Sequence, residues 1–105
     1  MKLNKKIVKE LAGYASLLKR MEKDNRLLPT HLGLFTGLFI CWQRNGFVSP
    51  FGVTRKTLMA FSKVASIATY HKCIKELDEY GYIHYEPSYH PRLGSQIHWP
   101  TDLEV

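Results

Sequence analysis

The spacing of apolar positions predicts two helices in the first half of the chain. Over residues 3 to about 23, apolar side chains recur every three or four positions, as on one face of an amphipathic helix. The main stripe is formed by Ile7, Leu11, Tyr14, Leu18 and Met21, and Val8, Ala15 and Leu17 widen it. Residues 31–44 are apolar on nearly every side, which is typical of a helix at the centre of a domain. Thr30 is the expected N-cap of this second helix, and Asn45-Gly46 is its expected end.

Two glycines, Gly33 and Gly37, lie inside the second predicted helix. Each lowers helix propensity by about 1 kcal/mol relative to alanine. Their four-residue spacing places both on one face of the helix. We therefore expect another element of the chain to pack closely against this face and to offset the cost.

The middle of the chain predicts two further helices joined by a three-residue connection. Thr54 can cap a helix over residues 55–62, and Ser66 can cap the next one, which ends near Tyr80 before Gly81. The first of these helices is expected to bury Leu58, Met59 and Phe61. The second is expected to bury Tyr70, Cys73, Ile74 and Leu77.

After Gly81 the apolar period changes to that of a strand. Residues 82–86 alternate between apolar and polar, residues 96–99 form a second short strand, and residues 87–95 are a turn-rich connection. Residues 47–53 are expected to be a loop or a short extended piece. The pattern as a whole predicts an α+β fold that is mostly helical and has a C-terminal β-hairpin.

Composition places the chain among globular cytoplasmic proteins. Its 105 residues are 45% hydrophobic and 23% charged, as in an ordinary single domain. Its two cysteines, Cys41 and Cys73, fall within apolar helical patterns and are expected to be reduced core thiols. No secretory signal pattern opens the chain, and its most apolar run, residues 32–42, is too short to span a bilayer. We expect no membrane partner.

Positive charge is concentrated in two segments. The net charge is +6, and residues 54–75 hold five Lys or Arg residues and no acid. Residues 1–26 are also basic, whereas residues 76–105 hold six acids and one arginine. A protein polarised in this way suggests an anionic partner, most commonly nucleic acid.

Two helices joined by a short turn, a glycine stop and a hairpin resemble a winged helix-turn-helix. The resemblance is clearest over residues 54–99 and rests on the run Ser66-x-x-Thr69-Tyr70-x-Lys72-x-Ile74-x-x-Leu77-x-x-x-Gly81-Tyr82-Ile83. This run is similar to one in GntR-type and MarR-type regulators and in DnaD-like replication-initiator domains. The chain also resembles small winged-helix proteins of plasmids and other mobile elements. The resemblance implies a winged helix-turn-helix domain over residues 27–105. The additional helix within residues 1–26 has no role fixed by the resemblance, and we expect it to be accessory or to mediate dimerisation.

The resemblance implies that the partner is double-stranded DNA and that helix 66–80 reads it. The residues nearest the base edges would be Ser66, Ile67, Ala68 and His71. Contacts with phosphates or guanine edges would come from Thr69, Lys72 and Lys75. The flanking backbone would be approached by Arg55 and Lys56, and the minor groove or its phosphates by His90 and Arg92 at the wing tip.

The order of charges along helix 66–80 points the same way. Lys72 and Lys75 precede three acids, Glu76, Asp78 and Glu79, in the last turns. Acids at the C-terminal end oppose the helix macrodipole, so stability alone favours the reverse order. We interpret the observed order as support for a DNA-binding end of the helix.

Other classes of function find less support in the sequence. There is no phosphate-binding glycine loop, no pair of carboxylates in an apolar setting and no nucleophile with a placed base, so we expect neither an enzyme nor a cofactor. We also expect no metal site, because His71 and Cys73 fall on opposite sides of a helix and His84 and His98 offer only two ligands.

The sequence leaves two main hypotheses of function open. The first is a sequence-specific DNA-binding protein that regulates transcription or assists replication or maintenance of a plasmid or mobile element. The second is a winged helix that binds protein only, with helix 3–23 docking to a larger complex. Helix 3–23 is expected either to pack on its own domain or to form a homodimer.

Overall fold

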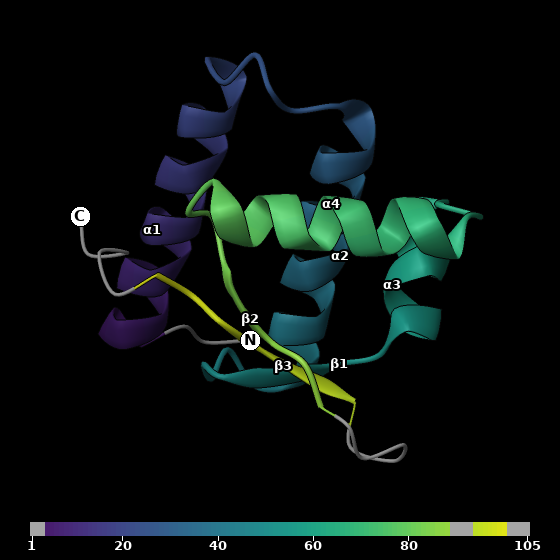
Figure 1. Cartoon of the computed structure of the whole chain (residues 1–105). Coiled ribbons are helices and arrows are strands. Elements are labelled where there is room, and N and C mark those ends of the chain that lie inside the picture. The colour runs from purple at the N-terminus through teal and green to yellow at the C-terminus, as the bar shows by residue number, and fades with distance from the viewer. Residues whose placement is uncertain (1–3, 89–93, 101–105) are drawn as a thin grey trace.

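The computed structural model describes residues 4–88 and 94–100, which form four helices and one three-stranded antiparallel sheet (Figure 1). The helices are α1 (Lys5–Glu22), α2 (Pro29–Arg44), α3 (Arg55–Ser62) and α4 (Ile67–Glu79). The strands are β1 (Phe51–Val53), β2 (His84–Glu86) and β3 (Ser95–His98). The predicted α+β class is confirmed. No helix in the described part of the chain is long and apolar enough to cross a membrane.

Local capping explains where α3 and α4 begin. The Thr54 hydroxyl accepts the Thr57 amide at 3.2 Å, and the Ser66 hydroxyl accepts the Thr69 amide at 3.2 Å. Gly81 follows α4 with a φ of +83°, which suits a residue without a side chain. The predicted bounds of both helices are confirmed.

The start of α2 differs from the prediction. Its N-cap is Leu28, and Thr30 lies in the first turn, so the prediction of Thr30 as the cap was wrong. Pro29 occupies the first helical position, where its fixed φ is compatible with a helix start. The ring nitrogen Nδ1 of His31 then accepts the Leu28 amide at 2.8 Å, so an imidazole replaces the expected hydroxyl as the capping acceptor.

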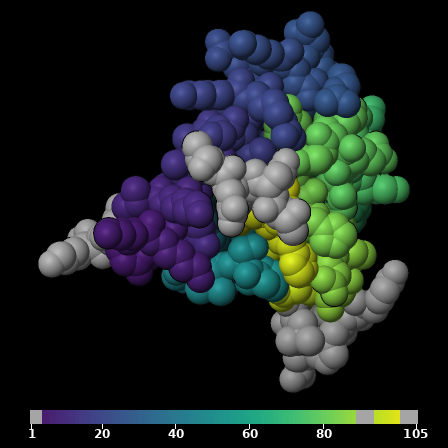
Figure 2. All heavy atoms as spheres, turned by 90° about the vertical axis from the view of Figure 1, so that its left-hand side faces the viewer, coloured from purple at the N-terminus to yellow at the C-terminus, as the bar shows by residue number. Residues whose placement is uncertain are grey.

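The core is built around aromatic side chains of α2. Phe35 and Trp42 are fully buried, and Tyr14 of α1 stacks on Phe35 with ring centroids 4.6 Å apart. The Tyr14 hydroxyl also donates a hydrogen bond to the Phe35 carbonyl at 2.9 Å. Figure 2 looks onto the side of the molecule that carries α1. These contacts make α1 part of the same core as the rest of the chain.

The buried face of α1 covers only part of the predicted apolar stripe. Leu17 is buried as predicted, whereas Leu18 and Val8, which belong to the same stripe, are 40% and 52% exposed. Tyr14, Leu17 and Met21 follow the spacing of three and four that keeps one helix face against the core. Leu18 therefore falls one step around the helix, toward solvent.

The two glycines of α2 allow the close approach of another element, as predicted, and the structure shows that this element is α3. A Cβ on Gly33 would lie 3.3 Å from the Ser62 carbonyl oxygen, and one on Gly37 would lie 3.3 Å from Leu58 Cδ2. Leu58 is fully buried, but Phe61 is 41% exposed, so its predicted burial was wrong. The Phe61 ring instead lies against the Arg44 guanidinium at 5.2 Å.

The sheet places β3 between β1 and β2. Ile97 at its centre is fully buried and pairs with Phe51 on one side and Tyr85 on the other. Residues 51–53 therefore form the short extended piece expected within 47–53. The first hairpin strand begins at His84 and not at residue 82, because Tyr82 and Ile83 pack into the core ahead of it. Cys41 and Cys73 are buried free thiols, as predicted.

We expect Gly94→Ala to destabilise the sheet by about 1–3 kcal/mol. Gly94 has a φ of +63°, and a Cβ there would lie 2.5 Å from the Val53 carbonyl oxygen, so the two strands would have to separate. Gly46→Ala is the matched control, because Gly46 has a φ of +73° but no atom within 4 Å of the added Cβ. Urea denaturation followed by circular dichroism measures both variants. Equal losses of stability would show that the strand contact has no effect.

Candidate nucleic-acid interface

One face of α4 points to solvent and carries the predicted contact residues. Its exposed positions follow helical spacing and are Ala68, His71, Lys72, Lys75 and Glu79. The opposite face is buried and consists of Tyr70, Cys73, Ile74 and Leu77, as predicted. Four of the predicted contact residues therefore share one surface.

The N-terminal end of α4 is also exposed, but its side chains carry no charge. Ile67 is 49% exposed, and Thr69 is only partly exposed. Ser66 is exposed, and its hydroxyl oxygen accepts the Thr69 amide. Because that oxygen acts as a cap, Ser66 has a structural role that is independent of any contact with DNA.

Arg55 and Lys56 lie beside this surface, at the start of α3. Both are exposed, and both line a hollow of about 490 Å³ between α3, α4 and the β2–β3 hairpin. His71 of α4 and Tyr85 of β2 line the same hollow. The fold thus places His71 at the same hollow as Arg55 and Lys56, which precede it in the chain by 16 and 15 residues.

The basic side chains of this surface are not neutralised by ion pairs. Among the described residues, no acid lies within ion-pair distance of Arg55, Lys56, Lys72 or Lys75. Exposed positive charges without such partners can pair with an anionic ligand. The surface formed by Arg55, Lys56, Ala68, His71, Lys72 and Lys75 is called the basic face below.

Two of the three acids at the end of α4, Glu76 and Asp78, form hydrogen bonds within the fold. The Glu76 carboxylate interacts with His31 Nε2 at 3.1 Å and accepts the Tyr80 hydroxyl at 3.1 Å. Asp78 accepts the Tyr85 amide at 3.0 Å and so fixes the start of β2. Burial raises the pKa of Glu76, but the hydrogen bonds from His31 and Tyr80 outweigh it, and the net shift is downward. These contacts account for Glu76 and Asp78 without any DNA, so the positions of these two acids are not independent support for DNA binding.

The predicted contact residues of the hairpin cannot be compared with the structure, but its two strands can. His90 and Arg92, predicted for the wing tip, lie outside the described residues. His84 and His98 face each other across β2 and β3 with ring centroids 5.4 Å apart. His98 Nε2 also lies 2.9 Å from a Glu86 carboxylate oxygen. The described part of the hairpin thus carries one exposed acid beside its two histidines.

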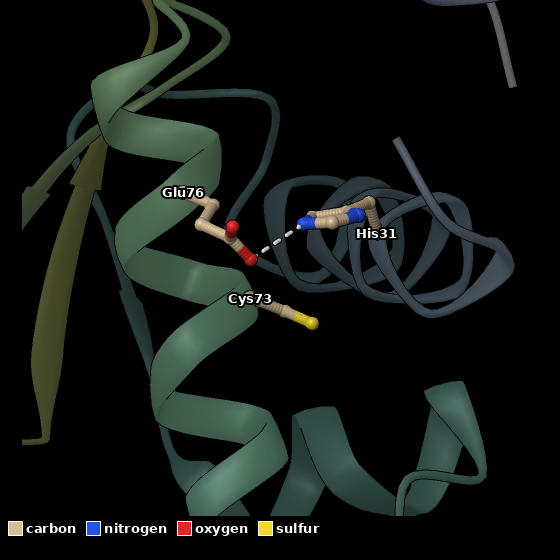
Figure 3. Close-up of side chains that lie close together, drawn as sticks. All are labelled: His31, Cys73 and Glu76. Atoms are coloured by element: carbon tan, nitrogen blue, oxygen red, sulfur yellow. Dashed lines mark hydrogen bonds and ion pairs between the residues drawn. The ribbon is translucent and has the colours of Figure 1, made fainter. Parts of the chain in front are cut away.

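A cluster that sequence reasoning missed lies between α2 and α4 (Figure 3). His31, Cys73 and Glu76 place a ring nitrogen, the thiol sulfur and a carboxylate oxygen within 4.8 Å of one another. His31 and Glu76 are 45 residues apart in the chain, so no short motif contains both. The only local signal is the three-residue spacing of Cys73 and Glu76, which places them on one side of a helix.

Comparison with known proteins yields no relative. No family model, no curated protein and no solved structure matches this chain. The features that bear on function are therefore the basic face and the order of the elements around it.

Proposed function

We propose that this protein binds double-stranded DNA in a sequence-specific manner as a winged helix-turn-helix protein. It would act as a transcriptional regulator or as an accessory factor in replication or maintenance of a plasmid or mobile element. The observation that carries the proposal is the basic face, in which one exposed side of α4 and the start of α3 present four cations that form no ion pair with an acid of residues 4–88 or 94–100. The element order α2–β1–α3–α4–β2–β3, with β3 at the centre of the sheet, supports the winged-helix class.

In this proposal α4 is the helix that enters the major groove. Its 13 residues span about 20 Å at 1.5 Å per residue, and the groove, about 12 Å wide, admits a helix. The first turns of a recognition helix reach base edges, which assigns Ala68 and His71 to that role. Lys72 and Lys75 would donate to guanine edges or to phosphates.

The start of α3 would hold the adjacent DNA backbone. Arg55 and Lys56 bring two positive side chains to the N-terminal end of α3, where the helix dipole also favours an anion. Phosphate contacts of this kind position a protein on DNA but do not select a sequence. The base-edge residues of α4 would supply the selectivity.

The test is selection from a pool of random duplexes, repeated over a series of salt concentrations. We expect one motif to be enriched, with affinity that falls steeply as salt increases because basic side chains displace counterions from phosphates. The spacing of any repeated half-sites would also report whether the protein binds as a dimer. Weak binding without enrichment would contradict the proposal and leave only the nonspecific attraction of a +6 protein for DNA.

The second candidate function is a protein-interaction module that uses α1. Val8 is 52% exposed and Leu18 is 40% exposed, so α1 offers apolar surface to a partner or to a second copy of the chain. The homodimer through this helix stays a prediction that light scattering tests. If it forms, Val8→Glu combined with Leu18→Glu should convert it to a monomer without removing Tyr14, Leu17 or Met21 from the core.

A further inference from the structure

Three side chains with metal-ligating atoms meet between α2 and α4. His31 lies in the first turn of α2, and Cys73 and Glu76 lie one turn apart on α4. Figure 3 shows Glu76 reaching toward the imidazole, with Cys73 beside it on the same side of α4. His31 and Cys73 are buried, whereas the Glu76 side chain is 22% exposed.

We propose that His31, Cys73 and Glu76 form a binding site for a Zn²⁺ ion. Imidazole, thiolate and carboxylate are the ligands that zinc uses in proteins. Tetrahedral geometry at the usual bond lengths separates such ligand atoms by about 3.3–3.6 Å. His31 Nε2 and Glu76 Oε1 are already 3.1 Å apart, and all three ligand atoms lie within 4.8 Å. Closing the site thus requires Cys73 Sγ to move by at most about 1.3 Å toward the other two ligand atoms, through side-chain rotation combined with a shift of α4 against α2.

Neighbouring hydroxyl groups are placed to support two of the ligands. Thr30 Oγ1 lies 3.3 Å from Cys73 Sγ and can donate a hydrogen bond to the thiolate. The Tyr80 hydroxyl donates to Glu76 Oε2 and leaves Oε1 for the ion. Hydrogen bonds of this kind orient metal ligands and raise affinity. Water can fill the fourth position through the exposed edge at Glu76.

Metal binding has a defined proton balance. In the metal-free protein the Leu28 amide donates to His31 Nδ1, so the ring proton is on Nε2 and is donated to Glu76. When zinc binds at Nε2, that proton passes to Nδ1, and the hydrogen bond from the Leu28 amide to Nδ1 is lost. The Cys73 thiol loses its proton to solvent and forms the sulfur–zinc bond. One proton is therefore released for each ion bound.

The zinc site does not rest on the proposed DNA binding, because the observations behind it are contacts between α2 and α4 within one chain. A bound ion would link the start of α2 to the middle of α4. An ion that binds only the folded protein raises its melting temperature, and the rise grows with the logarithm of ion concentration relative to the dissociation constant. The site can thus be tested on the free protein.

The test is a titration of the chelator-treated full chain with Co²⁺, followed by displacement with Zn²⁺. We expect one equivalent of Co²⁺ to produce a thiolate-to-cobalt charge-transfer band that Zn²⁺ removes. Cys73→Ser should abolish the band, and Glu76→Gln should weaken Zn²⁺ affinity by at least about tenfold. Cys41→Ser is the matched control, because Cys41 is the other buried free thiol and lies outside the cluster, so its band should persist.

Three results would overturn the proposal. The first is a wild-type protein that shows no charge-transfer band and no rise in melting temperature with one equivalent of metal. The second is a band that survives Cys73→Ser. The third is a Zn²⁺ affinity that falls with His84→Ala and not with Glu76→Gln, which would place the ion on the hairpin. Circular dichroism of each variant verifies its fold, and Glu76→Gln alters a partly exposed side chain, so the test does not depend on Cys73→Ser folding.

Discussion

Lys72→Glu is expected to abolish sequence-specific DNA binding while the protein remains folded. Lys72 is exposed on the basic face between His71 and Lys75, and Arg55 and Lys56 lie at the start of the neighbouring helix. Loss of one such contact weakens binding by about 1–3 kcal/mol, which is roughly 5- to 150-fold, and the new carboxylate adds repulsion from the phosphates. The enriched duplex, titrated with each protein by fluorescence anisotropy, measures the effect.

The control for this variant must separate a local contact from net charge. Lys19→Glu makes the same change in charge at an exposed position of α1, away from the basic face. We expect Lys19→Glu to retain most of the affinity. Equal losses in the two variants would mean that binding depends on overall charge. Undiminished binding by Lys72→Glu would show that α4 does not recognise the DNA sequence.

The fold should tolerate Lys72→Glu well. The new carboxylate lies four residues before Glu76, and like charges at that spacing destabilise a helix by about 0.2–0.5 kcal/mol. This is small beside the expected loss of binding energy. Circular dichroism and a urea titration of the variant distinguish the two effects.

The largest loss of stability is expected for Trp42→Ala, at about 3–5 kcal/mol. Trp42 is fully buried, and its ring lies 5.0 Å from that of Phe47 and 5.3 Å from that of Trp99, measured between centroids. Tyr14 and Phe39 also contact it. Removing the indole would leave a cavity at the junction of α1, α2 and the end of β3. Because small domains are stable by only about 5–15 kcal/mol, a large fraction of the total would be lost.

Trp42→Phe is the matched control for this prediction. It retains an aromatic ring and removes the indole N–H, which has no hydrogen-bond partner among the described residues. A buried donor without a partner is unfavourable, so its removal offsets part of the lost packing. Urea denaturation followed by circular dichroism compares the variants. Trp42→Ala and Trp42→Phe with equal stability would show that this ring cluster does not hold the fold together.

Sequence reasoning was most accurate where the controlling interactions are local. The caps Thr54 and Ser66 and the stop at Gly81 act within one turn of the residues they control, and the bounds of α3 and α4 were predicted from them. The buried face of α4 followed from its spacing for the same reason. The close approach of α3 to Gly33 and Gly37 was also predicted, although the identity of the approaching element was not.

Sequence reasoning failed where contacts between distant segments decide the outcome. Either Leu17 or Leu18 fits the apolar stripe of α1, and only packing against α2 determines which one is buried. The acids of α4 were interpreted by the helix dipole alone, because their partners His31 and Tyr85 lie outside that helix.

The sequence by itself therefore determined the helices, the caps of α3 and α4 and the composition of the basic face, because periodicity, capping and charge are properties of neighbouring residues. Only the tertiary structure decided that Arg55, Lys56 and His71 border one hollow and that His31 meets Cys73 and Glu76. Contacts across 15 to 45 residues depend on how α2, α3 and α4 pack, and packing depends on the shapes of many side chains at once.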